Sequence, residues 1–167
     1  MSSTYLVALG SNRRHHLYGD PRGVVLAAME ELAAFGTVAA RSPVIATPAM
    51  GAAQRRFANA ALVLESELDP PALLAALKRT EGEFGRRPGQ RWGDRVLDCD
   101  IVLWSGGAWH SRGLTIPHPA YAQRRFVLDP ACTIAPDWRT PLHGLTLAHH
   151  QARLTRPRPL PRGAPFA

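Results

Sequence analysis

The segment FANAALVLESELDPP, Phe57–Pro71, contains both kinds of element from which the fold is built. Its first part, Phe57–Leu68, is a strand-like run that alternates apolar and polar residues toward Glu65 and Glu67. The Asp-Pro-Pro that follows is a helix start, because aspartate caps the free N–H groups of a first turn and proline fits its first position. The segment therefore predicts a strand followed directly by a helix.

The sequence on either side supplies the same two elements again. A second Asp-Pro start at Asp20 begins a helix expected to end at Gly36, and the helix after Asp69 should continue to about Phe84. The expected strands are Tyr5–Leu9, Val38–Ala46, Phe57–Leu68 and Val96–Trp104. The order strand–helix–strand–strand–helix–strand is the split βαβ arrangement, which predicts an α+β fold with helices on one face of an antiparallel sheet.

Long loops and a C-terminal region complete the expected organisation. Thr47–Arg56 and Gly85–Asp94 are loops of a length that is often functional. Later in the chain we expect, in order, a hairpin turn at Gly106-Gly107, a proline-bracketed loop at Thr115–Pro119, and helices over Phe126–Ile134 and Leu145–Leu154. Residues 1–154 should form a single domain, and the Pro- and Arg-rich residues 155–167 a disordered tail.

Composition narrows the class of protein. With 167 residues, 46% hydrophobic and 20% charged, the chain suits one globular domain with a sizeable core. No apolar run approaches the roughly 20 residues of a membrane span, and Tyr5–Leu9 is too short for a signal-peptide core. Cys99 and Cys132 are too few for a disulfide framework or a four-ligand zinc site. We expect a cytoplasmic, reduced protein without a membrane partner.

The net charge of +7 lies mostly at the C-terminal end. No acidic residue follows Asp137, whereas five arginines do, so residues 1–138 carry only +2 of the +7. The five are Arg139, Arg153, Arg156, Arg158 and Arg162. The folded part is therefore only mildly cationic, and we expect no specific nucleic-acid partner.

Two carboxylates in RVLDCDI, Arg95–Ile101, are the strongest local sign of chemistry. On a strand, Asp98 and Asp100 point to one face with Cα atoms about 6–7 Å apart, while Cys99 points to the other. Such a pair suits Mg²⁺, which takes one or two carboxylates and completes its shell with phosphate and water. The alternative is a solvated strand face on which both acids pair with arginines.

Arginines surround this pair along the sequence. Arg86, Arg87, Arg91 and Arg95 lie in a Gly-containing loop just before it. Guanidinium groups bind phosphate bidentately, so acids beside an arginine loop favour phosphoryl transfer over an exposed basic loop without a role. The sequence has neither a P-loop nor a dinucleotide-binding glycine motif.

Taken in order, several motifs resemble the 6-hydroxymethyl-7,8-dihydropterin pyrophosphokinase family. They are YLVALGSN (5–12), TPAMG (47–51), FANA (57–60), RWGDRVLDCDI (91–101), LTIPHP (114–119), RRFVLDP (124–130) and IAP (134–136). The resemblance covers about residues 5–138. It implies a ferredoxin-like split βαβ sandwich with long catalytic loops, and transfer of pyrophosphate from ATP to the hydroxymethyl group of the dihydropterin, a step of folate synthesis that releases AMP.

The resemblance also implies roles for individual residues. Asp98 and Asp100 would hold two Mg²⁺ ions and, with Arg86 and Arg95, form the catalytic set. The ATP-binding positions are Glu81, Arg86, Arg87, Arg91, Arg95, Ile101, Thr115, His118 and Arg124. The pterin-binding positions are Thr47, Pro48, Met50, Phe57, Asn59, Trp92 and Phe126, the two phenylalanines stacking on the flat ring. We expect a monomer whose partners are these two small substrates.

Departures and rival interpretations remain. Asp94 stands where the family usually has proline, and Gly113 where an arginine is expected, although neighbouring Arg112 could reach the same phosphate. An RNA-binding module is the main alternative, because split βαβ sheets also stack bases on exposed aromatics. A fragment of a bifunctional enzyme is another, but 167 residues supply no second domain, so we expect a stand-alone enzyme.

Overall fold

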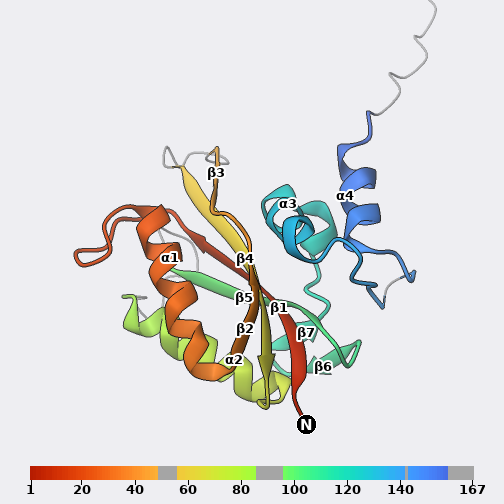
Figure 1. The fold of residues 1–167 in the computed structure, drawn as a ribbon, viewed down its shortest axis with the longest axis horizontal. Coiled ribbons are helices and arrows are strands. Elements are labelled where there is room, and N and C mark those ends of the chain that lie inside the picture. The colour runs from red at the N-terminus through yellow and green to blue at the C-terminus, as the bar shows by residue number, and fades with distance from the viewer. Residues whose placement is uncertain (49–55, 86–95, 142, 158–167) are drawn as a thin grey trace, which may run out of the picture.

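The sheet is the centre of the fold, as Figure 1 shows. A computed structural model describes residues 1–48, 56–85, 96–141 and 143–157. Its main sheet has the strand order β2-β4-β1-β5, with β3 also pairing with β4, and every pairing is antiparallel. The strands are β1 (Ser3–Ser11), β2 (Thr37–Arg41), β3 (Ile45–Thr47), β4 (Phe57–Ser66) and β5 (Asp98–Trp104).

Each long helix connects two strands that have a third strand between them. Helix α1 (Pro21–Glu31) links β1 to β2 around β4, and helix α2 (Pro70–Glu83) links β4 to β5 around β1. This is the α+β, antiparallel arrangement that the order of elements predicted. It leaves β1 and β4 in the middle of the sheet and β5 at one edge.

Both predicted aspartate caps are present. The Asp20 carboxylate accepts a hydrogen bond from Gly23 N, and that of Asp69 accepts one from Ala72 N, each at 2.9 Å. A short 3-10 segment, η1 (Leu32–Phe35), follows α1 and ends at Gly36 as expected. The caps satisfy N–H groups that a helix start leaves without a partner, which is why these two starts were readable from sequence.

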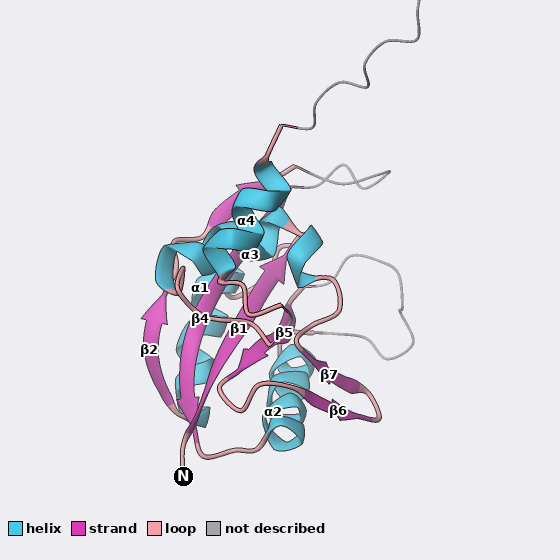
Figure 2. Cartoon of the chain, turned by 90° about the vertical axis from the view of Figure 1, so that its right-hand side faces the viewer, coloured by secondary structure: helices cyan, strands magenta, loops and turns pink. Residues whose placement is uncertain are grey.

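The predicted arrangement of helices on one face is wrong, because helices cover both faces of the sheet. Helices α1 and α2 pack on the face that carries Tyr5, Val7 and Leu9. Two later helices, α3 (Arg125–Ile134) and α4 (Leu147–Thr155), form a layer on the opposite side (Figures 1 and 2). Alternate residues of β1 thus enter two separate apolar clusters, which buries both sides of the central strands.

The predicted strand Val38–Ala46 is divided into β2 and β3. At the break, Ser42 N donates to Ala61 O at 2.9 Å and Ala61 N donates to the Ser42 hydroxyl at 2.8 Å. The next residue is Pro43, which has no N–H to continue the ladder. A serine side chain therefore replaces one backbone acceptor, and pairing with β4 resumes at Ile45.

A small hairpin that the sequence analysis missed lies beside the edge strand β5. Its strands are β6 (Trp109–Ser111) and β7 (Leu114–Ile116). The predicted turn at Gly106-Gly107 joins β5 to β6, with Gly107 N donating to Trp104 O at 3.0 Å. The hairpin's own turn contains Gly113 at φ +80°, a left-handed conformation that glycine adopts without strain. This geometry explains a glycine where an arginine was expected.

The C-terminal helices occur close to where they were predicted. A 3-10 turn, η2 (Tyr121–Gln123), precedes α3, and α4 continues to Thr155. The side chain of His150 on α4 is buried, with Nε2 3.2 Å from the Tyr121 hydroxyl and 3.0 Å from the Thr140 hydroxyl. These contacts fix α4 to the turn before α3. The predicted tail lies mostly outside the described residues.

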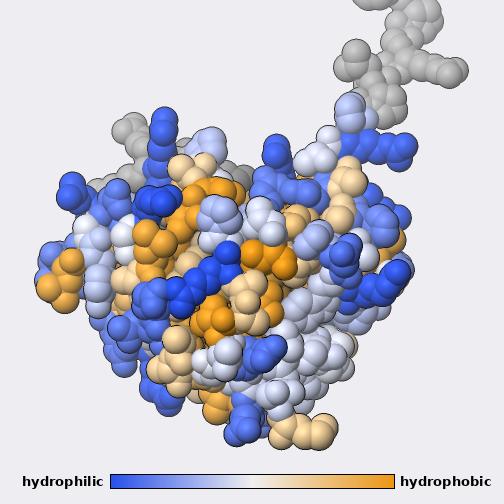
Figure 3. Space-filling model, in the orientation of Figure 1, coloured by the Kyte–Doolittle hydropathy of each residue, from blue (hydrophilic) through white to orange (hydrophobic). Residues whose placement is uncertain are grey.

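The surface of the molecule is mixed in character. In Figure 3, apolar side chains gather along the middle of one face, where the sheet edge lies between the helix layers, and hydrophilic side chains surround them. None of the described helices has the length and apolar content needed to cross a membrane.

Candidate functional site

Pairing across three strands brings together residues that are far apart in the sequence. Asp98 on β5 pairs with Gly10 on β1, and Gly10 pairs with Asn59 on β4. In the next row of the same face, Asp100 pairs with Ala8, which pairs with Ala61. The amide of Asn59 and both carboxylates therefore lie on one face of the sheet, the face toward α3.

Gly10 allows this close arrangement. A Cβ atom at this position would lie 3.0 Å from the Asn59 Oδ1, a tighter contact than side chains normally make. The Asn59 side chain is buried, and its Nδ2 donates to the Thr47 hydroxyl on β3 at 2.8 Å. Two residues expected at a pterin site, Thr47 and Asn59, are thus in direct contact, and the contact fixes the direction of the amide.

The electrostatics of Asp100 fit a cation site. Burial, and then the neighbouring charge of Asp98, raise the pKa of the Asp100 carboxyl; His118, Lys78 and Arg124 act in the opposite direction. The ionised pair is therefore unfavourable by itself, and a bound divalent cation would relieve the repulsion. Oxygen donors of this kind suit Mg²⁺.

The described residues provide two carboxylates for such an ion. Among them, no group of three or more His, Cys, Asp or Glu side chains is arranged to hold a metal. A Mg²⁺ ion typically uses one or two carboxylates and takes its other ligands from phosphate and water. The pair therefore fits a metal that arrives with a nucleotide better than a permanently caged ion.

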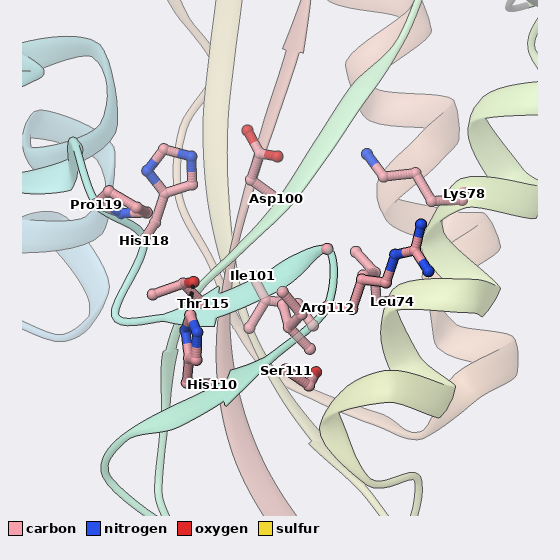
Figure 4. Close-up of a pocket in the computed structure, with 12 residues that line it drawn as sticks. Leu74, Lys78, Asp100, Ile101, His110, Ser111, Arg112, Thr115, His118 and Pro119 are labelled. Atoms are coloured by element: carbon pink, nitrogen blue, oxygen red, sulfur yellow. Dashed lines mark hydrogen bonds between the residues drawn. The ribbon is translucent and has the colours of Figure 1, made fainter.

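A cavity of about 490 Å³ opens beside this pair, between β5, α2 and the β6–β7 hairpin. Figure 4 shows Asp100 between His118 on one side and Lys78 on the other. Ile101 and Thr115, both expected at an ATP site, also line the cavity. Further lining residues are Leu74, His110, Ser111, Arg112, Gly113, Leu114 and Pro119.

Glu81 lies beside the cavity but has no exposed side-chain surface. Its Oε1 accepts hydrogen bonds from Cys99 N at 2.8 Å and from Lys78 Nζ at 2.9 Å. Burial raises the pKa of the Cys99 thiol well above its usual value, and Glu81, Asp98 and Asp100 raise it further. The Glu81 side chain is buried in this structure, and its expected contact with ATP stays a prediction.

Arg124 and the candidate aromatic residues lie around the same end of the sheet. Phe126 on α3 is partly buried, and the Arg124 guanidinium carbon lies 5.6 Å from the centre of its ring. Phe57, at the start of β4, pairs with Thr47 and is also partly exposed. Pro48 follows β3 at the surface. Phe57 thus shares with Asn59 the face of β4 against which α3, the helix of Phe126, packs.

Six of the expected site residues cannot be compared with the structure. They are Met50, Arg86, Arg87, Arg91, Trp92 and Arg95, and all lie outside the described residues. Asp94, the departure from the usual proline, lies outside them as well.

The structure adds Lys78, His110 and Arg112 to the candidate site, since all three line the cavity. Lys78 carried one signal that could have been used: it lies three residues before Glu81 on a helix, at the spacing of an ion pair. His110 and Arg112 depend on the β6–β7 hairpin, which the sequence analysis did not predict. Arg112 was considered as a substitute for the arginine expected at Gly113, and it lines the cavity.

Comparison with known proteins agrees with this geometry. Residues 6–136 match the family model described as 7,8-dihydro-6-hydroxymethylpterin-pyrophosphokinase (HPPK). The match includes both aspartates, Asn59 and the whole lining of the cavity, and it spans most of the chain. The chain belongs to this family. It is therefore an enzyme, a pyrophosphokinase, and the RNA-binding alternative is wrong.

Curated relatives carry the corresponding name, 2-amino-4-hydroxy-6-hydroxymethyldihydropteridine pyrophosphokinase. The protein of Methylorubrum extorquens is 39% identical over 140 residues, 82% of this chain and 85% of that protein. The protein of Pseudomonas aeruginosa is 39% identical over 138 residues, 81% of this chain and 82% of its own length. The match to the Synechocystis protein, at 40% identity, spans 59% of this chain and about half (51%) of that protein.

Solved structures support the fold. The chain superimposes on Plasmodium falciparum HPPK-DHPS with a TM-score of 0.67 over 92% of its length. A second HPPK-DHPS structure, in complex with substrates, gives a TM-score of 0.70 over 90%. Sequence identity is 11% in both, and the chain spans 44% of each of those longer proteins. At this identity the likeness concerns the fold alone.

Proposed function

We propose that this pyrophosphokinase transfers the β,γ-diphosphate of ATP to the hydroxymethyl oxygen of 6-hydroxymethyl-7,8-dihydropterin. The hydroxymethyl oxygen attacks the β-phosphorus, the bond from that phosphorus to the α–β bridging oxygen breaks, and AMP leaves. The product is the dihydropterin diphosphate, and the hydroxyl proton passes to solvent or a nearby base. The reaction is a step of folate biosynthesis. The row Asn59–Gly10–Asp98, across three strands, is the observation that carries this proposal.

On the pterin side, the oriented Asn59 amide would donate to and accept from the polar edge of the ring. The Thr47 hydroxyl supports this, since it accepts from the Asn59 Nδ2 and leaves the amide oxygen for a ligand group. Phe57 and Phe126 would stack on the two faces of the ring. Pro48, Met50 and Trp92 are proposed to complete the pterin site.

On the nucleotide side, the cavity between α2 and the β6–β7 hairpin would hold ATP. Ile101 would contact the adenine, and Thr115, His118 and Arg124 the sugar and phosphates. Arg86, Arg87, Arg91 and Arg95 are proposed to bind the triphosphate, with Arg86 and Arg95 stabilising the charge that builds up during transfer. Arg112 and Lys78 extend this cationic lining.

Asp98 and Asp100 are proposed to hold Mg²⁺, two ions with ATP bound. When bound, such ions would offset phosphate charge and make the β-phosphorus more electrophilic. The residues of this chain fix where that happens: β5 holds both carboxylates on one face, and the pairing with Gly10 keeps them next to the pterin amide.

Three broader expectations belong to the same proposal. The topology supports the ferredoxin-like class, because both split units share one antiparallel sheet. We propose that residues 1–154 form a single catalytic domain and residues 155–167 a tail. We also propose a monomer that acts in the cytoplasm.

The test is to mix the protein with ATP, Mg²⁺ and the hydroxymethyl dihydropterin and to quantify AMP and the pterin diphosphate by chromatography. AMP should appear in a one-to-one ratio with the pterin product and only when the pterin is present. ADP in place of AMP, or AMP without pterin, would contradict the proposed transfer. Asp100→Ala is the negative control, and Glu65→Ala, an exposed acid at the far end of β4, is the matched positive control.

A further inference from the structure

Glu81 is a fully buried acid at the boundary between α2 and the edge strand β5. Its Oε1 accepts two hydrogen bonds: one from Cys99 N at 2.8 Å, and one from Lys78 Nζ at 2.9 Å. The lysine side chain is 41% exposed and lines the nucleotide cavity, whereas that of Glu81 has no exposed surface. The acid thus links the cavity wall to the backbone of β5.

The N–H group of Cys99, which donates to Glu81, lies on the outer side of the edge strand. Strand β5 lies at the edge of the sheet, with β1 on its inner side only. A backbone N–H that faces away from β1 needs a partner from outside the ladder. Cys99 is the residue between Asp98 and Asp100, so the Glu81 bond holds the backbone between the two carboxylates.

Stability alone does not account for an acid at this position. Removing a carboxylate from water costs several kcal/mol, and an apolar side chain of similar size is often at least as stabilising. What the carboxylate provides, and an apolar side chain could not, is a charge-assisted hydrogen bond to the backbone N–H of Cys99.

We propose that Glu81 is a positioning residue for the metal-binding pair: it fixes β5 at Cys99 so that Asp98 and Asp100 are held ready for a divalent cation. Lys78 offsets the charge of Glu81 from the cavity side. This inference rests on the proposed function, because it takes Asp98 and Asp100 to be the metal ligands. It replaces the expected direct contact of Glu81 with ATP.

The test measures metal binding apart from turnover. Mn²⁺ affinity is determined by electron paramagnetic resonance of the free ion, in the presence of a non-hydrolysable ATP analogue. Loss of a group that orients metal ligands typically weakens binding by about 10- to 100-fold, and Glu81→Ala should fall in this range. Glu81→Gln keeps an acceptor oxygen for Cys99 N and should be intermediate. Affinity for the analogue without metal should stay within about twofold in both variants.

Two control variants make the result decisive. Glu83→Gln, an exposed acid on the same helix, should bind Mn²⁺ as the wild type does. Asp98→Asn must weaken Mn²⁺ binding; if it does not, the proposed metal site itself is wrong. If Asp98→Asn weakens binding but a folded Glu81→Gln stays within twofold of wild type, the positioning role is overturned while the metal site stands. Loss of metal-free analogue affinity in Glu81→Gln would instead restore the direct contact.

Kinetics and hydrogen exchange provide independent readouts. Saturating Mg²⁺ should restore most of the kcat of Glu81→Gln, which a general loss of folded protein would not allow. If the variants do not fold, hydrogen exchange of the wild-type protein still tests the proposal. The Cys99 amide, despite its place on an edge strand, should exchange as slowly as the amides of β1. Fast exchange at Cys99 would overturn the proposal.

Discussion

The two halves of the site differ in how complete they are without ligands. In the half near β3, the Asn59 amide is buried and held by the Thr47 hydroxyl at 2.8 Å. In the half on β5, Asp100 lies beside the like charge of Asp98, and its pKa is raised by burial and by that charge. The comparison indicates that the proposed pterin half is formed by folding, whereas the proposed phosphate half holds two neighbouring acids whose repulsion a bound cation would relieve.

The sharpest test of this difference is to remove a carboxylate. Asp98→Ala or Asp100→Ala should lower kcat/KM by at least about 10³-fold, or roughly 4 kcal/mol of barrier. The melting temperature of the metal-free protein should not fall, because repulsion within the pair is relieved. Steady-state kinetics and thermal unfolding check both, with Glu65→Ala as control. A variant with wild-type turnover, or one that is strongly destabilised, would break the comparison.

The pterin half should respond to loss of one hydrogen bond. Thr47→Val removes the hydroxyl that accepts from the Asn59 Nδ2, and one such bond is worth about 1 kcal/mol. We expect pterin affinity to fall about fivefold, while nucleotide affinity is unchanged, as measured by calorimetry. Thr37→Val, at an exposed position on β2, is the control. An equal loss of affinity for both ligands would mean that the halves are not separate.

The stability of the layer formed by α3 and α4 should depend on pH through His150. Burial, with help from Arg153, His143 and His149, lowers the pKa of the His150 imidazole below its ordinary value of 6.5. As the pH falls below about 6.5, the unfolded chain takes up this proton before the folded protein does. The contribution to the free energy of unfolding is therefore present at neutral pH and is lost on acidification.

Unfolding in urea at pH 7.5 and pH 5.5 measures this effect. The wild-type protein should lose stability between these two pH values, and the part of the loss due to His150 should be absent in His150→Gln. His110→Gln, at an exposed position on β6, should keep the wild-type difference. An unchanged pH dependence in His150→Gln would show that another group is responsible.

The smallest effect is expected from the C-terminal end. The proposed site residues all precede Pro136, so both halves should be unaffected when Thr155–Ala167 is deleted. We expect kcat/KM within about twofold of wild type, a barrier change of roughly 0.4 kcal/mol. A hundredfold loss in a folded truncated protein would show that one half of the site includes part of this segment.

The sequence predicted those parts of the fold that depend on interactions between residues close together in the chain. Asp20 and Asp69 cap α1 and α2 because each cap involves only the next few residues. The break at Ser42 depends on Ala61, which lies 19 residues away, and could not be read locally. The second helix layer was missed for a related reason: burial of both faces depends on where α3 returns in space.

In the candidate site, too, features that depend on neighbouring residues were predicted, and features that depend on distant residues were not. Alternation along β5 predicted that Asp98 and Asp100 share a face, and the strand places them so. Their pairing with Gly10 and Asn59 depends on strand order, which no local pattern encodes. The burial of Glu81 depends on the docking of α2 against β5, so its hydrogen bond to the β5 backbone could be seen only in the structure.

The location of Lys78 has a practical consequence for handling the protein. It is the sole lysine among 167 residues, the other basic side chains being arginines and histidines. Amine-reactive dyes, crosslinkers and sensor-chip coatings, which usually attach at random, can here react only at the N-terminal amine or inside the cavity. Coupling at the cavity would block ligand access and leave an apparently inactive population. Attachment through an engineered tag avoids this artefact. Deliberate acylation of Lys78, in contrast, would place a label at the cavity with an ordinary amine-reactive reagent.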